Sequence, residues 1–127
     1  KQIKMKKLIA ILVMMISFAG LAQEKKSKKK EIVFKVNGNC EMCEKRIEKA
    51  AFSVKGVKDA QWHQDCQDVH VIIDERKCSA DDVKKAIAVA GHDTDTFKAT
   101  DEAYEELHGC CQYKRLPNTN DNEVKKH

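Results

Sequence analysis

Apolar residues between positions 31 and 100 switch between a period of two and a helical period, and this order limits the possible folds more than any other feature. Residues 31–37, 57–64 and 69–74 alternate apolar and polar side chains, which predicts three strands. Residues 41–54 place apolar side chains at helical spacing, which predicts a helix between the first two strands.

A second helix is predicted to begin after Ser79, because Asp82 lies three residues further on and Ser is a preferred N-cap residue. Gly91 ends this helix, a short strand follows around Phe97, and residues 101–107 form one or two helical turns. The order strand, helix, strand, strand, helix, strand predicts an α+β, ferredoxin-like βαββαβ sandwich.

The directions of these elements bring three connections to one end of the predicted sheet. These connections contain Cys40 and Cys43, then Cys66, then His92. Cys78 is expected at the opposite end, about one strand length away, together with the start of the C-terminal tail.

Residues 1–22 have the features of a secretory signal peptide. Basic Lys6 and Lys7 precede an apolar run over residues 8–22, with small residues before a predicted cleavage between Ala22 and Gln23. The alternative is a retained membrane anchor, but this run is shorter than the ~20 apolar residues that span a bilayer. We therefore expect a periplasmic or secreted protein.

The remaining chain divides into a Lys-rich linker over 23–30, a folded domain over 31–100 and a C-terminal tail over 101–127. Residues 31–127 carry 15 basic and 19 acidic side chains, a net charge of −4. This balance excludes nucleic acid as the expected partner, because phosphate binding needs clustered Lys and Arg. A chain of 127 residues is also too short for most multi-domain enzymes.

Cys40 and Cys43 form a C-x-x-C pair where the first strand leads into the first helix. Their spacing lets both sulfurs bind one ion, and the positive end of the helix dipole favours thiolates. Two close thiolates suit soft ions, Cu(I) first and Hg(II) as an alternative, whereas a structural Zn(II) site usually takes four ligands. The other interpretation is a disulfide or redox pair, although the pair has no preceding Trp and no nearby Pro.

Residues 31–99 resemble the heavy-metal-associated (HMA) domain, the family of copper chaperones, P-type ATPase N-terminal domains and the periplasmic mercury-binding protein. Cys40 and Cys43 match the two ligand positions of the family's Gly-Met-x-Cys-x-x-Cys loop. Residues 37–39 stand where the family has Gly-Met-x, so the loop methionine is absent. Residues 86–92 resemble the end of the family's second helix. The resemblance implies metal transport, with a membrane transporter or an acceptor metalloprotein as partner.

Further candidate ligands lie outside this motif. His92 is expected beside the pair, either as a loop residue or as a ligand or proton donor, and Cys66 is either a third thiolate or a free thiol. Cys110 and Cys111 either add ligands for a soft metal or form a disulfide, with Cys78 or with each other.

The sequence therefore predicts an exported, non-enzymatic protein that captures a soft ion, Cu(I) before Hg(II) or Zn(II), and passes it on by thiolate exchange. The alternatives are a thiol–disulfide redox protein that uses the C-x-x-C pair and a protein that only sequesters metal.

Overall fold

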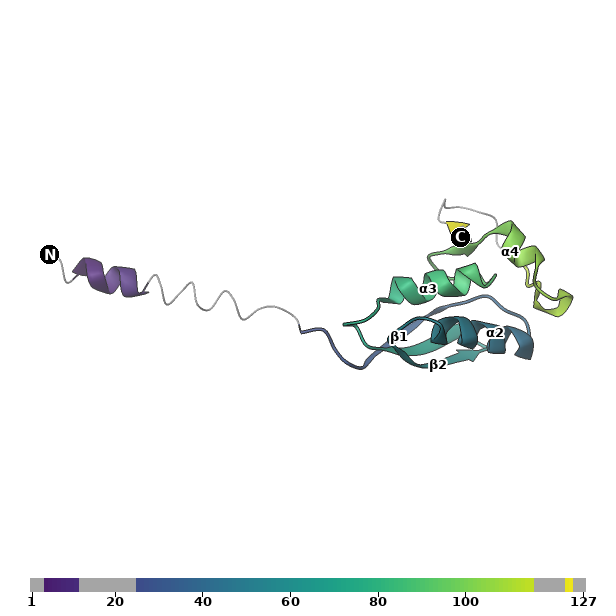
Figure 1. The fold of residues 1–127 in the computed structure, drawn as a ribbon, viewed down its shortest axis with the longest axis horizontal. Helices are drawn as coiled ribbons and strands as arrows, with labels where there is room; N and C mark the ends of the chain where they lie inside the picture. The colour runs from purple at the N-terminus through teal and green to yellow at the C-terminus, as the bar shows by residue number, and fades with distance from the viewer. Residues whose placement is uncertain (1–3, 12–24, 116–122, 125–127) are drawn as a thin grey trace.

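The computed structural model describes residues 4–11, 25–115 and 123–124 (Figure 1). Its main sheet has three antiparallel strands in the order β1-β3-β2, with bounds Lys30–Lys35, Asp68–Ile73 and Val57–His63. The three strands agree with the prediction to within two residues at each end.

One face of this sheet is buried. Phe34 on β1 and Trp62 on β2 both pair with Val69 on β3, and all three side chains are at most 5% exposed. Val33 on the opposite face of β1 is 52% exposed. The period of two in the sequence therefore separates a core face from a solvent face.

Two helices cover the buried face, α2 over Glu41–Phe52 and α3 over Ala80–Val89. Their core positions are Cys43, Ile47 and Ala51 on α2, and Val83, Ile87 and Ala88 on α3. The predicted cap of α3 is confirmed as a capping box. The Ser79 hydroxyl accepts a hydrogen bond from the Asp82 N–H, and the Asp82 carboxylate accepts one from the Ser79 N–H.

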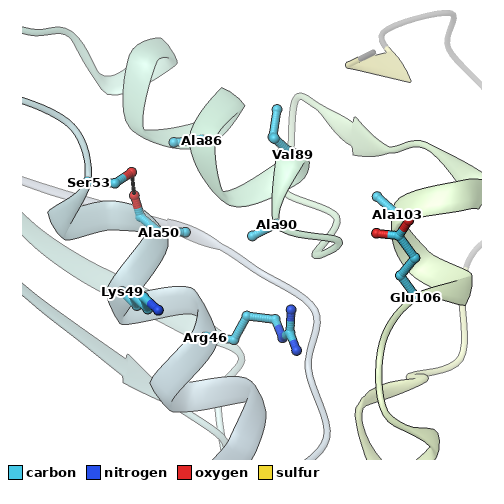
Figure 2. A pocket seen from close by; sticks show the side chains of 9 residues that line it. All are labelled: Arg46, Lys49, Ala50, Ser53, Ala86, Val89, Ala90, Ala103 and Glu106. Atoms are coloured by element: carbon cyan, nitrogen blue, oxygen red, sulfur yellow. Dashed lines mark hydrogen bonds between the residues drawn. The ribbon is translucent and has the colours of Figure 1, made fainter. Parts of the chain in front are cut away.

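Small side chains line the space between α2 and α3. Ala50 lies opposite Ala86 and Ala90, beside a groove of about 410 Å³ that Arg46 and Glu106 also line (Figure 2). Alanines at these positions keep side-chain bulk out of the space between the two helices.

The fourth strand differs from the prediction. The chain makes a single bridge between Thr94 and Val36 and then turns, because the Thr94 N–H donates to the Phe97 carbonyl oxygen at 2.8 Å. The following strand β4, Lys98–Ala99, pairs in parallel with β5, Glu123–Val124, and not with β1. The main sheet therefore has three strands within the described residues.

This turn changes the path of the tail. Helix α4, Asp101–Glu105, and the 3₁₀ turn η2, Gly109–Cys111, follow β4. A Cβ atom on Gly91 would lie 3.0 Å from the Leu107 side chain, so the tail packs against the end of α3. The tail therefore lies at the end of the sheet where α2 begins, and the expectation that it starts at the Cys78 end is wrong.

The N-terminal segment is only partly described. Residues 4–11 form a helix, whereas most of the predicted apolar run and the predicted cleavage between Ala22 and Gln23 lie outside the described residues. Helices within the described ranges are all too short or too polar to cross a membrane. In the predicted linker, the Ser27 carbonyl oxygen accepts a hydrogen bond from the Glu75 N–H at 3.0 Å.

Candidate metal centre

The loop over residues 37–40, which we call the site loop, is tied to the end of α3. The His92 Nδ1–H donates to the Asn37 carbonyl oxygen at 2.8 Å, and the Asn37 N–H donates to the Asp93 carbonyl oxygen at 2.9 Å. These bonds join the two connections that the sequence places at one end of the sheet.

The side chain of Trp62 lies directly beneath the site loop. Its indole N–H donates to the Val36 carbonyl oxygen at 3.0 Å, and the side chain is 3% exposed. A Cβ atom on Gly38 would lie 2.9 Å from the Trp62 ring and 3.0 Å from the Cys43 Cβ. Glycine at position 38 therefore lets the loop pack closely on this ring, a role of Trp62 that its alternating strand position did not reveal.

The hairpin between β2 and β3 supports the loop with glutamines and not with Cys66. The Gln64 Nε2 donates to the Asn39 carbonyl oxygen at 2.5 Å, and the Gly38 N–H donates to Gln67 Oε1 at 2.9 Å. Cys66 is exposed and lies outside the group of close thiols.

Cys40 and Cys43 bring their sulfur atoms together at the start of α2. The two Sγ atoms are 3.6 Å apart, and Cys40 is the N-cap residue in an extended conformation. Cys43 is fully buried and its sulfur accepts a hydrogen bond from the Asn39 N–H at 3.3 Å, whereas Cys40 is partly exposed. The pair therefore has one accessible and one protected sulfur.

The surroundings of Cys40 favour its thiolate. Burial opposes ionisation, but hydrogen bonds from the Cys43 backbone and from the neighbouring thiols outweigh it and lower the pKa of Cys40 to about 7. A large fraction of Cys40 is therefore ionised at neutral pH, ready to act as a metal ligand.

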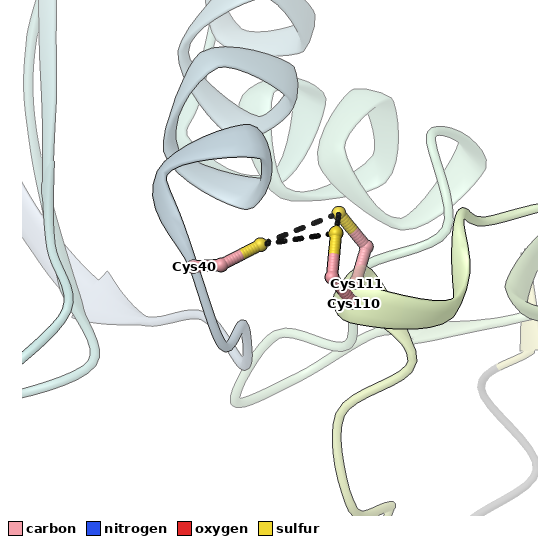
Figure 3. A group of neighbouring side chains, drawn as sticks. All are labelled: Cys40, Cys110 and Cys111. Atoms are coloured by element: carbon pink, nitrogen blue, oxygen red, sulfur yellow. Dashed lines mark hydrogen bonds between the residues drawn. The ribbon is translucent and has the colours of Figure 1, made fainter.

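Both cysteines of η2 join this pair. Cys40 Sγ is 3.7 Å from Cys110 Sγ and 3.7 Å from Cys111 Sγ, and the three sulfur atoms all lie within 4.8 Å of one another (Figure 3). Met42 Sδ lies 3.5 Å from Cys110 Sγ. Burial, followed by the nearby sulfurs of Cys43 and Cys40, raises the pKa of Cys111, so its thiol holds its proton in the absence of metal.

His92 stabilises the site loop through its hydrogen bond to the Asn37 carbonyl oxygen. It is fully buried, its ring stacks on Tyr113 with centroids 5.5 Å apart, and its Nε2 has no hydrogen-bond partner among the described residues. Burial lowers the pKa of His92 to about 4, against the opposing effect of its bond to Asn37. His92 does not belong to the group of close donor atoms around Cys40.

Cys78 lies at the other end of the sheet. It follows β3, whose last residue Ile73 pairs with Lys30 at the start of β1, while Cys40 follows the end of β1. The expectation that Cys78 lies at the same end of the sheet as the start of the tail is wrong, because the tail lies at the Cys40 end. A disulfide between the tail and Cys78 does not fit this arrangement.

Tyr113 and Arg115 hold the tail in place, a role that no motif or periodic pattern in the sequence predicts. The Tyr113 hydroxyl accepts a hydrogen bond from the Asp93 N–H at 2.8 Å and donates to the Gly91 carbonyl oxygen at 2.9 Å. The Arg115 guanidinium binds both carboxylate oxygens of Asp93, at 3.0 and 2.9 Å. Tyr113 is the only aromatic residue after Tyr104, and that isolation was the available signal.

Comparison with known proteins identifies similar structures. No protein-family profile matches the sequence, and the search of curated proteins finds no match, whereas several solved structures are similar. The CopZ metallochaperone is 27% identical over 51% of this chain and 98% of its own, with a TM-score of 0.50. Oxidized MerP from Ralstonia metallidurans CH34 is 27% identical over 52% of this chain and 93% of its own, also at 0.50. The water-soluble region of the P-type ATPase CopA from Bacillus subtilis is 29% identical over 58% of this chain and 49% of its own, at 0.51.

Proposed function

We propose that this protein, a heavy-metal-associated domain protein by its fold and its structural neighbours, binds one soft metal ion through Cys40 and Cys43 and passes it to an acceptor. The observation that carries this proposal is the 3.6 Å separation of the two Sγ atoms at the start of α2, with the pKa of Cys40 at about 7. Cu(I) is the ion we favour, because two close thiolates suit a soft ion of low coordination number, and Hg(II) or Zn(II) are alternatives.

The two sulfurs have different parts in this transfer. Cys40 is partly exposed and largely ionised at neutral pH, so it makes the first bond to an arriving ion. Cys43 is buried and anchors the ion from below. An acceptor thiolate then adds to the ion from the exposed side before the bond to Cys40 breaks, so the ion is not released into water.

We further propose that the protein acts outside the cytoplasm, with a membrane metal transporter or an acceptor metalloprotein as its partner. The signal-peptide pattern of residues 1–22 supports export. The structural similarity to the water-soluble region of the P-type ATPase CopA supports a partner of the transporter class.

Titration of the reduced protein with Cu(I), against a chromophoric Cu(I) chelator, tests the proposal. We expect Cys40→Ser and Cys43→Ser to weaken binding by orders of magnitude. Cys66→Ser and Cys78→Ser are matched controls that remove a thiol outside the site and should leave the affinity unchanged. Equal affinity in all four variants would contradict the proposal, and metal-free turnover of a disulfide substrate that requires Cys40 would favour a redox protein.

A further inference from the structure

Three sulfur atoms from two distant segments of the chain form a nearly equilateral triangle at the start of α2 (Figure 3). Its sides are 3.7 Å from Cys40 to Cys110, 3.7 Å from Cys40 to Cys111 and 4.0 Å from Cys110 to Cys111. A point equidistant from these three atoms lies about 2.2 Å from each, close to the ~2.3 Å of a metal–thiolate bond. The triangle therefore has the size of a three-coordinate thiolate site.

Two more sulfur atoms border the triangle. Cys43 Sγ lies 3.6 Å from Cys40 Sγ on one side, and Met42 Sδ lies 3.5 Å from Cys110 Sγ on the other. Cys40 is therefore shared between the C-x-x-C pair and the tail cysteines. Thiolates and thioethers are the ligands that soft ions select, so the surroundings match the same class of ion as the pair itself.

The tail is fixed on both sides of its two cysteines. Leu107 before them is 4% exposed, and Tyr113 after them is 2% exposed. The double hydrogen bond of Tyr113 and the contact of Arg115 with buried Asp93 hold the chain that leaves η2. Since none of these contacts uses a sulfur atom, they hold the tail sulfurs in position and leave them little conformational freedom to lose when an ion binds.

Core packing explains only one of the two tail cysteines. Cys111 is fully buried, so a thiol there also fills space as a small apolar side chain. Cys110 is exposed, yet its sulfur contacts the sulfurs of Cys40 and Met42. Burial gives no reason for a cysteine at this position, whereas metal ligation does.

The geometry points to a site of at least three thiolates, in which Cys110 and Cys111 join the Cys40–Cys43 pair on one soft cation such as Cu(I). This inference rests on the proposed function and deepens it. Ligands from two segments about seventy residues apart retain the ion more firmly than the pair alone. Cys110 is the exposed tail ligand, so an acceptor thiolate displaces it first, and the tail then controls release.

X-ray absorption of the full chain, reduced and loaded with one equivalent of Cu(I), tests this inference. We expect at least three sulfur ligands in the wild-type protein and two in the double variant Cys110→Ser/Cys111→Ser. The control variant Cys66→Ser/Cys78→Ser loses the same number of thiols and should keep the wild-type coordination number. Because a tethered ligand acts at an effective concentration in the millimolar range, the tail variant should also bind Cu(I) at least about tenfold more weakly in chelator competition.

Two sulfur ligands in the wild-type protein, or equal coordination numbers in the wild-type and tail variants, would overturn the inference. The proposed function would then still stand if Cys40→Ser abolishes binding, whereas absence of Cu(I) binding in the wild-type protein would defeat the proposed function itself. If the double variant fails to fold by circular dichroism, the single variant Cys110→Ser replaces it, because that side chain is exposed.

Discussion

Cys40 and Cys78 lie at opposite ends of the β1–β3 pair, in surroundings that differ in exposure and in neighbours. We call the group of Cys40, Cys43, Cys110 and Cys111 the thiol end, and the group of Gly56, Ile73 and Cys78 the far end. Cys40 is partly exposed and has three sulfur atoms within 3.7 Å. Cys78 is 7% exposed, and the hydrogen-bond partner of its sulfur is the Asp74 carbonyl oxygen, at 4.0 Å.

The pKa of a cysteine thiol is therefore shifted in opposite directions at the two ends. Burial raises the pKa of Cys78, and the negative charges of Asp82 and Asp74 raise it further. At Cys40 the hydrogen bonds outweigh burial and lower the pKa to about 7. Neighbouring donors and thiols, and not the presence of a cysteine, therefore distinguish a metal ligand from a core residue.

The largest expected effect is on stability at the far end. Ile73→Ala should lower the free energy of unfolding by about 2–5 kcal/mol, because Ile73 is 2% exposed and its loss leaves a cavity. Cys40→Ser at the thiol end should change it by no more than about 0.5 kcal/mol, as expected for a partly exposed site. Urea denaturation of the metal-free proteins measures both. If Cys40→Ser is as destabilising as Ile73→Ala, the thiol end is a structural element like the far end.

Acid should lower the free energy of unfolding, because His92, which supports the site loop at the thiol end, is buried in its neutral form. Its pKa is about 4 in the folded protein and about 6.5 when unfolded, so between these values the unfolded chain binds more protons. The contribution of neutral His92 to the free energy of unfolding is complete above about pH 6.5 and is lost as the pH falls toward 4. We expect a loss of about 2–3 kcal/mol between pH 7 and pH 4.5.

The variant His92→Phe isolates this effect from the carboxylates that titrate in the same range. It keeps an aromatic ring against Tyr113 and removes the titrating group. The difference in unfolding free energy between wild-type and variant proteins should therefore change by about 2–3 kcal/mol over this pH range. A constant difference would show that His92 is not held neutral by burial.

The sheet, the two long helices and the Cys40–Cys43 pair could be predicted because each depends on a local pattern. Alternation of apolar residues identifies the strands, and the Ser79–Asp82 spacing identifies the start of α3. The C-x-x-C spacing likewise lies within one turn of helix. These signals are contained in a few neighbouring residues, so the rest of the fold does not alter them.

The path of the tail could not be predicted because its determinants lie far apart in the sequence. Asp93 is buried with Arg115 as its partner, twenty-two residues away, and the Ala99 N–H also donates to its carboxylate at 2.8 Å. No periodic pattern links these residues. Extending the predicted fourth strand along β1 therefore led to the wrong end of the sheet, beside Cys78.

Each end has a glycine beside it, and the two glycines should differ in how well they tolerate a side chain. Gly56 at the far end has φ +108°, and a Cβ there would lie 2.8 Å from Lys77 Cβ and 3.0 Å from Cys78 Sγ. Gly56→Ala should therefore cost about 2 kcal/mol of unfolding free energy. Gly109→Ala, beside the thiol end, is the control, because within the described part of the chain no residue other than its immediate neighbours lies within 4 Å of its added Cβ. Thermal denaturation compares the two, and equal losses would contradict the expected strain at Gly56.

The smallest expected effect is a difference in thiol reactivity. At pH 7 about half of Cys40 is thiolate, against about one hundredth or less of Cys78, whose pKa is raised from 9.0. The lower basicity of the Cys40 thiolate reduces its intrinsic nucleophilicity and offsets part of this gain. We therefore expect iodoacetamide to alkylate Cys40 about tenfold faster in the reduced, metal-free protein, as measured by peptide mass spectrometry.

The pH dependence separates ionisation from simple access to the reagent. The alkylation rate of Cys40 should rise through pH 7 and level off above about pH 8, because its pKa is about 7. The rate of Cys78 should continue to rise beyond pH 9. Parallel profiles at the two positions would mean that exposure alone sets the reactivity. The hydrogen bonds around Cys40 would then not account for the difference between the two ends.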